Sequence, residues 1–115
     1  KKEFKNIPYI TLPVYSKNIY HTYHLFTVLF DFEKLKISKN FFMKKLAENG
    51  IGSQVLYIPV FLQPYYKKKY NFKIKDFPNA MHYYERALSI PIFFDITKKE
   101  LKKVINKIKK LTTNI

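Results

Sequence analysis

The sequence predicts an α+β domain in which a short, mostly antiparallel sheet carries its helices on one face. Short segments rich in β-branched and aromatic residues alternate with segments that have apolar residues at helical spacing. Two of the helical segments begin with a capping residue. The length of 115 residues suits one domain with a packed core. The predicted order of elements is β-β-α-β-α-β-α.

Two strands are expected first. Residues 9–15 (YITLPVY) form a short apolar segment that Pro13 limits as a strand. Residues 21–31 (HTYHLFTVLFD) form the best candidate strand, and both of its faces are largely apolar. One face would carry Tyr23, Leu25, Thr27 and Leu29, and the other His24, Phe26, Val28 and Phe30. Helices on one side of the sheet leave the second face open, so we expect something outside the chain to cover it.

A helix and a third strand follow. Ser38 is placed to cap a helix that runs through Glu48, with Ile37 and Phe42 as its hydrophobic staple and Gly50 just beyond its end. Residues 55–58 are typical of a strand that Pro59 ends. A loop through Tyr66 and a lysine-rich connector over residues 67–76 are expected next.

The last three elements are a helix, a strand and a helix. Pro78 suits the first turn of a helix that reaches about Leu88, and residues 89–93 (SIPIF) predict a strand. Thr97 and Glu100 form a capping box ahead of a strictly periodic apolar stripe. That stripe consists of Leu101, Val104, Ile105, Ile108 and Leu111.

The charge balance raises the question of an anionic partner. The 22 basic residues outnumber 8 acidic ones, which gives a formal charge of +14, yet only Arg86 is an arginine. Readers of bases and phosphates rely on the bidentate fork of arginine. Richness in Lys, Ile and Asn also fits an AT-rich genome. We therefore expect no nucleic-acid partner, and keep a stand-alone basic module for nucleic acid or anionic surfaces as the alternative.

The residues supply no self-sufficient catalytic site. The chain has no cysteine, no phosphate-binding glycine loop and no paired carboxylates of the acid/base kind. His21 and His24 would lie on opposite faces of a strand, so no metal site is expected. The lysines of the last helix indicate a solvated face. No apolar run could span a bilayer and no signal peptide is present, so a cytoplasmic protein without a membrane partner is expected.

Three blocks carry a resemblance to a known family. They are YHLFTVLFD, AENGIGSQVLYIPVFLQPYY and FPNAMHYYERALSIPIF, followed by the Thr-led helix. From about Tyr20 to Leu111 the chain resembles the C-terminal domain of the DegT/DnrJ/EryC1/StrS family of pyridoxal-phosphate (PLP)-dependent nucleotide-sugar aminotransferases. Within this family it is most similar to the transaminases of pseudaminic acid biosynthesis.

The resemblance implies a fold-type I enzyme in which a large PLP-binding domain precedes a small one. Residues 1–115 would be that small domain, and the chain starts at Lys1 rather than Met, as a segment of a longer protein would. Such enzymes are homodimers that move an amino group, here from glutamate, to the C4 keto group of a UDP-4-keto-6-deoxy-N-acetylhexosamine. The large domain would hold PLP and its lysine. The segment alone would be inactive, and an inactive gene remnant stays an alternative.

The resemblance also implies four substrate-binding residues and no catalytic or cofactor-binding ones. Tyr23 and His24 match the aromatic–His pair of the family, and Gln54 and Tyr57 match its GxQVxY segment. The residues themselves leave another interpretation open, in which both tyrosines are core aromatics and Gln54 only satisfies backbone groups. The chain departs from the family pattern at Leu56 and Phe61, where the family often has histidine.

Overall fold

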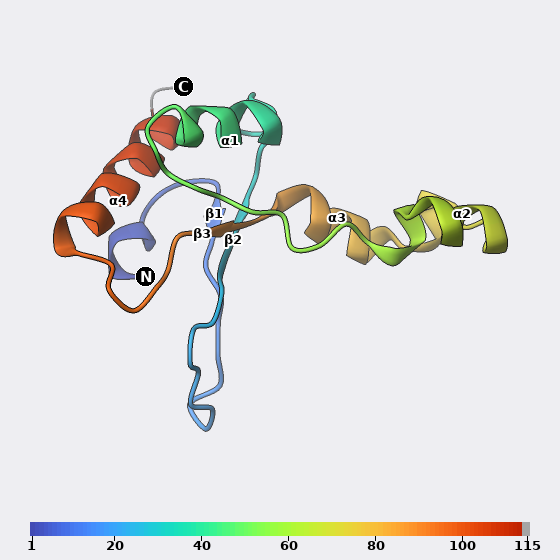
Figure 1. Ribbon diagram of the computed structural model, residues 1–115, viewed down its shortest axis with the longest axis horizontal. Helices are drawn as coiled ribbons and strands as arrows, with labels where there is room; N and C mark the ends of the chain where they lie inside the picture. Colours follow the sequence, from blue (N-terminus) through green and yellow to red (C-terminus); the bar gives the residue numbers. More distant parts are fainter. Residues whose placement is uncertain (114–115) are drawn as a thin grey trace.

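A three-stranded antiparallel sheet forms the centre of the protein (Figure 1). The computed structural model describes residues 1–113. Strand β2 (Phe26–Phe30) lies between β1 (Ile10–Thr11) and β3 (Ala87–Ile90). In the register of the two pairs, Ile10 faces Phe30, and Phe26 faces Ile90. The α+β class and the antiparallel sheet are as predicted.

One face of the sheet is covered by the helices α1 (Lys39–Ala47) and α4 (Lys98–Thr113), which lie together in Figure 1. Side chains of β2 and β3 on this face are buried together with residues of both helices. They include Phe26, Val28, Phe30, Leu88 and Ile90 from the sheet, Phe42 and Leu46 from α1, and Val104 and Ile108 from α4. Phe4, from the short 3-10 helix η1 (Lys2–Phe4), closes one side of this core. Burial of these apolar groups is the main force that holds the layers together.

Both predicted helix caps are present. The Ser38 hydroxyl accepts a hydrogen bond of 3.1 Å from the amide of Phe41 at the start of α1. Before α4, the amide of Thr97 donates to Glu100 Oε2 at 2.9 Å, and the amide of Glu100 donates to Thr97 Oγ1 at 3.2 Å. Each bond satisfies an amide that has no partner inside the helix. The capping residues therefore define where the two covering helices begin.

The opposite face of the sheet is not covered by α1 or α4. Leu25, Thr27 and Leu29 are partly or largely exposed on this side, in contrast to their neighbours along β2. We call it the open face: the side of the sheet that carries these three residues, together with Ala87 and Ser89 opposite them. Ala87 and Ser89 are themselves buried, at 7% exposure each, so this face is open mainly over β2.

The prediction of a long strand over residues 21–31 is wrong for the first half of this segment. Only Phe26–Phe30 forms β2, and residues 12–25 project from the sheet as a long loop (Figure 1). Tyr23 has a φ of 54°, a left-handed conformation that a strand residue does not adopt. The first predicted strand likewise shrinks to two residues, Ile10–Thr11.

The strand predicted over residues 55–58 does not form. A single antiparallel bridge joins Gln54 to Ser89 on the free edge of β3, after which the chain leaves the sheet. Val55 still packs against the core, but Tyr57 and Ile58 are exposed at 78% and 52% and do not continue the strand. The 3-10 helix η2 (Val60–Leu62) follows.

A helix not predicted from the sequence occupies the lysine-rich connector. It is α2 (Pro64–Tyr70), with Pro64 in its first turn, and it is followed by the 3-10 helix η3 (Ile74–Asp76). The next helix, α3 (Pro78–Arg86), ends two residues earlier than predicted, because Ala87 is already extended with φ −72° and ψ 132°. Strand β3 therefore covers residues 87–90 instead of 89–93. Among residues 1–113, no helix combines the length and apolarity needed to cross a membrane.

Candidate functional site

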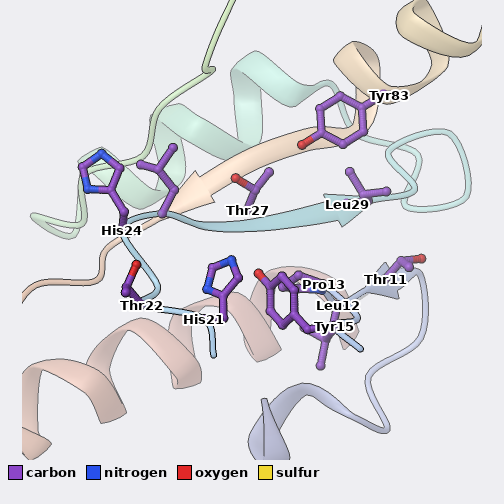
Figure 2. Close-up of a pocket in the computed structure, with 11 residues that line it drawn as sticks. Thr11, Leu12, Pro13, Tyr15, His21, Thr22, His24, Thr27, Leu29 and Tyr83 are labelled. Atoms are coloured by element: carbon purple, nitrogen blue, oxygen red, sulfur yellow. The ribbon is translucent and has the colours of Figure 1, made fainter. Parts of the chain in front are cut away.

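Three adjoining hollows lie along the open face. The central hollow has a volume of about 510 Å³ and lies between β2, the 12–25 loop and α3 (Figure 2). Its lining consists of Thr11, Leu12, Pro13, Tyr15, His21, Thr22, His24, Leu25, Thr27, Leu29 and Tyr83. Its volume falls within the range of about 300–1,000 Å³ that is usual for small-molecule sites.

Two smaller hollows flank the central one and share wall residues with it. One, of about 320 Å³, shares His24 and Leu25 and extends along the turn of residues 52–54 to Ser89. The other, of about 250 Å³, shares Tyr83 and extends to Tyr57. The three hollows are therefore neighbours, and we call them together the depression.

The pairing of β2 with β3 positions the floor of this depression. Thr27 lies opposite Ser89 in the register, and their side-chain oxygens are 2.9 Å apart in a hydrogen bond. Ser89 also exchanges two backbone hydrogen bonds with Gln54, of 2.8 and 3.0 Å. Because these bonds engage only the main chain of Gln54, its amide side chain stays available on the wall of the flanking hollow.

Aromatic rings of the 12–25 loop form the opposite wall. The rings of Tyr15 and His21 lie 3.8 Å apart between centroids, and Tyr23 packs on both. The amide of Tyr23 donates a 2.9 Å hydrogen bond to His21 Nδ1. Since Nδ1 accepts, the neutral imidazole carries its proton on Nε2, which leaves a donor for a ligand. The turn at Tyr23 thus sets the tautomer of His21.

The structure brings three of the four predicted site residues to the depression. His24 lies between the central hollow and one flanking hollow, Gln54 lines that flanking hollow, and Tyr57 lines the other. Tyr23 lines none of the three and instead packs against the core, with its ring centroid 6.3 Å from that of Phe26. Contact of any of them with a substrate stays a prediction.

Sequence reasoning missed several residues of the central hollow. Tyr15, His21, Thr27 and Tyr83 come from three separate segments, and only the fold brings them together. The alternation along β2 placed Thr27 on the correct face, which was the one available signal. Nothing in the local sequence indicates that α3 would bring Tyr83 over that face.

The two departures from the family pattern lie in different places. Leu56 lines the same flanking hollow as Tyr57. Phe61 is buried and stacks on Phe77, with centroids 4.5 Å apart and planes within 9°. A substitution at position 61 therefore changes the packing against Phe77 at the N-cap of α3, whereas one at position 56 changes the wall of a hollow.

The depression is uncharged although the protein is strongly basic. No Lys, Arg, Asp or Glu lines any of the three hollows. Their linings therefore offer no amine that could bind PLP covalently. Two cations border the central hollow: Arg86 Nη2 lies 3.5 Å from Thr11 Oγ1, and Lys1 Nζ lies 4.2 Å from the centre of the Tyr15 ring. Within residues 1–113, no three metal-ligating side chains come together either. These hollows can bind a neutral polar group by hydrogen bonds and ring contacts.

The charged groups lie on other surfaces. Lys109 on α4 pairs with Glu3 at 2.9 Å, and this hydrogen bond lowers the pKa of Glu3. Partial burial lowers the pKa of Lys39, whose ammonium donates a 2.6 Å hydrogen bond to the carbonyl of Tyr84. The α2 helix combines exposed tyrosines with the three lysines 67–69 and extends away from the sheet (Figure 1).

Comparison with known proteins decides the family. The profile of the DegT/DnrJ/EryC1/StrS aminotransferase family matches residues 1–109. The chain belongs to this family. Among curated proteins, the uncharacterized protein MJ1066 of Methanocaldococcus jannaschii is 36% identical over 112 residues, which cover 97% of the chain and 29% of that protein. The spore coat polysaccharide biosynthesis protein SpsC of Bacillus subtilis is 34% identical over 107 residues, 92% of the chain and 28% of SpsC.

Solved structures of aminotransferases share the fold. PseC of Helicobacter pylori, an aminotransferase of pseudoaminic acid biosynthesis, superposes with a TM-score of 0.86 at 21% identity, over 99% of the chain and 30% of PseC. The PLP-form of Spr1654 of Streptococcus pneumoniae, described as a sugar aminotransferase, gives a TM-score of 0.84 at 21% identity, over 98% and 28%. The chain thus spans less than a third of the length of the relatives it matches.

Proposed function

We propose that residues 1–115 are the C-terminal small domain of a PLP-dependent nucleotide-sugar aminotransferase. The complete enzyme transfers an amino group from glutamate to the C4 keto group of a UDP-4-keto-6-deoxy-N-acetylhexosamine, for surface-glycan or pseudaminic acid synthesis in the cytoplasm. Family membership over residues 1–109 supports the activity. The roles named for SpsC and PseC, in spore coat polysaccharide and pseudoaminic acid synthesis, support the substrate class.

One observation supports the role that we propose for this segment. The open face bears an uncharged, ligand-sized depression, while α1 and α4 cover the other face. A sheet in this arrangement suits one wall of a cleft whose other wall is the large domain. In the assembled homodimer this domain closes the cleft over the sugar nucleotide.

The cofactor belongs to the other wall. The depression has no lysine among its lining residues, so it does not itself fit PLP. PLP, held by the large domain, supplies the electron-sink chemistry of the reaction. The part of residues 1–115 is to bind and orient the substrate, and the segment alone is inactive.

His24 and Gln54 are proposed as the principal substrate contacts of this wall. They share one flanking hollow, and His24 also borders the central one. Tyr57 supplies a contact from the other end of the depression. Tyr23 acts indirectly, because its amide holds His21 and its ring supports the loop.

The test is amino transfer by the complete product of the reading frame that encodes these residues. With glutamate and the UDP-linked keto sugar, we expect His24→Ala to lower kcat/KM about tenfold, the effect of about 1.4 kcal/mol of lost transition-state binding. His82→Ala is the matched control, since His82 is exposed on α3 and lines none of the three hollows. Absence of amino transfer in the unmodified enzyme would refute the proposal.

The rival function is a basic binding module. The α2 tyrosines and lysines are the feature that favours it, because exposed rings between lysines bind single-stranded nucleic acid in other proteins. It requires submicromolar affinity with a steep dependence on salt. We expect only weak, non-specific binding at physiological salt, measured by fluorescence anisotropy with labelled oligonucleotides.

A further inference from the structure

We propose that Lys39 is a positioning residue of the substrate wall: its ammonium fixes the C-terminal turn of α3, and with it Tyr83, over the open face of the sheet. The inference rests on the proposed function, because it takes the depression as the part of this domain that meets the substrate. Lys39 itself lines none of the three hollows. It belongs to α1, one of the two helices that cover the opposite face.

The helix α3 is not held in place by a packed face. None of its residues is buried, whereas α1 and α4 both contribute buried side chains to the core. Its position therefore depends on contacts at its two ends. At the first end, Phe77 stacks on the buried Phe61. At the second end, Arg86 reaches Thr11 Oγ1 at a long 3.5 Å, whereas the contact of Lys39 is short.

Lys39 makes two contacts with one residue of that second end. Its Nζ donates a 2.6 Å hydrogen bond to the carbonyl of Tyr84 and lies 4.7 Å from the centre of the Tyr84 ring. Tyr84 is among the last four residues of α3, whose carbonyls have no amide of the helix to pair with. A cation also interacts favourably with the negative end of a helix dipole and with the face of an aromatic ring. All three effects stabilise the same turn.

The place of Lys39 in its own helix is unfavourable. It is the first residue of α1, directly after the Ser38 cap, where the helix dipole favours acidic groups. Partial burial lowers the pKa of Lys39, although the charge of Glu85 acts in the opposite direction, so the surroundings disfavour the charged form. The stability of α1 therefore does not account for a lysine at this position. Its contacts with Tyr84 do.

The turn that Lys39 holds carries part of the wall of the depression. Tyr83 lines the central hollow and the hollow of Tyr57, and Tyr84 lines the latter. Figure 2 shows the Tyr83 hydroxyl directed toward β2 from the α3 side. Misplacement of a binding group by about 1 Å is enough to weaken a site strongly. Because Lys39 is bonded to the residue next to Tyr83, loss of this bond lets the wall shift relative to β2.

The experiment compares three variants of the complete enzyme. Lys39→Met removes the ammonium but keeps the aliphatic part of the side chain and a high helix propensity, so it should fold. Lys39→Arg keeps a cation that can donate to a carbonyl and stack on a ring. Lys45→Met is the matched control, because Lys45 lies on the same helix, pairs with Glu48 at 2.8 Å and lies 5.5 Å from the centre of the Phe41 ring.

The expected kinetic result is a change in KM alone. Lys39→Met should raise the KM for the keto sugar about tenfold with kcat unchanged, the effect of one lost charged hydrogen bond that acts on binding. Lys39→Arg should restore most of the loss, and Lys45→Met should leave both constants unchanged. A loss of kcat at constant KM, or equal effects of Lys39→Met and Lys45→Met, would overturn the proposal.

Amide hydrogen exchange of the same variants separates positioning from general stabilisation. A contact that only adds to global stability changes exchange throughout the core, whereas a local contact changes it locally. We expect Lys39→Met to speed exchange about tenfold in residues 81–88 and to leave residues 102–112 of α4 unchanged. Equal acceleration in both segments would contradict the assignment of Lys39 to α3.

The two proposals can fail separately. If the complete enzyme does not transfer amino groups but exchange rises only in residues 81–88 of Lys39→Met, the proposed function falls and the hold of Lys39 on α3 stands. If amino transfer occurs and Lys39→Met behaves like Lys45→Met, the positioning role alone is refuted.

Discussion

The two glycines of the chain lie two positions apart and have different roles. Gly50 has a φ of 65°, in the left-handed region, just beyond the C-cap of α1 at Glu48. The next amide, of Ile51, donates to the carbonyl of Leu46 and so closes the end of the helix. A Cβ at Gly52 would meet open space, and its backbone does not require glycine. The turn that leads to Gln54 therefore depends on one glycine only.

This difference predicts the stability of two alanine variants. Gly50→Ala should lower the free energy of unfolding by about 1 kcal/mol, because a side chain in the left-handed region is strained. Gly52→Ala should stay within about 0.5 kcal/mol of the unmodified protein. Urea unfolding followed by circular dichroism measures both. Equal losses in the two variants would show that the positive φ is not the cause.

At the scale of elements, α1 and α4 begin with different kinds of cap. The cap of α1 is the neutral Ser38 hydroxyl, whereas that of α4 pairs Thr97 with the carboxylate of Glu100. Hydrogen bonds from Thr97 hold the pKa of Glu100 below its ordinary value of 4.5. A lowered pKa means that the folded state favours the charged carboxylate. Its stabilising effect is present above pH 4.5 and is lost as the pH falls through the lowered pKa.

The two caps therefore respond differently to acid. Thr97→Ala and Ser38→Ala should each cost about 1 kcal/mol of unfolding free energy at pH 7. Between about pH 5 and pH 3 the loss for Thr97→Ala should shrink, because the unmodified protein loses the same cap as Glu100 is protonated. The loss for Ser38→Ala should stay constant. Parallel pH profiles for the two variants would contradict the account of Glu100.

The two faces of the sheet predict a second contrast among elements. Leu88 is fully buried under the helices, while Leu25 on the open face is 37% exposed. Leu88→Ala should lower the free energy of unfolding by about 2–5 kcal/mol, the usual cost of a cavity in a packed core. Leu25→Ala should cost much less, because water can fill the space. Similar losses measured by urea unfolding would mean that the open face is as tightly packed as the covered one.

The elements that the sequence predicted well are those with a strong local signal. The helices behind Ser38 and Thr97 each begin with a cap and a hydrophobic staple, and the second also has an apolar stripe. Both formed where expected. The failures lie where tertiary contacts decide. Residues 55–58 have the composition of a strand but pair only at Gln54, and the lysine-rich segment after Pro64 folds as α2 although it buries no residue. The central hollow also depends on tertiary structure, because Tyr83 lines it only through the position of α3.

At the scale of the whole molecule, the protein has one covered face and one open face. The core between the sheet, α1 and α4 holds the fold together. Lysines lie on α1, α2 and α4, and none of them lines the depression. Two cations border it, since Arg86 Nη2 lies 3.5 Å from Thr11 Oγ1 and Lys1 Nζ lies 4.2 Å from the centre of the Tyr15 ring. The core and the depression thus lie on opposite sides of the same strands.

The most direct test of this account locates the PLP-binding lysine. The complete product of the reading frame is purified, reduced with borohydride without added PLP, and digested for mass spectrometry, which identifies the lysine that carries the reduced cofactor. We predict one modified lysine, outside residues 1–115, and no stoichiometric modification of the 21 lysines within them. A cofactor trapped on a lysine of residues 1–115 would contradict the assignment of this chain to the wall that binds substrate.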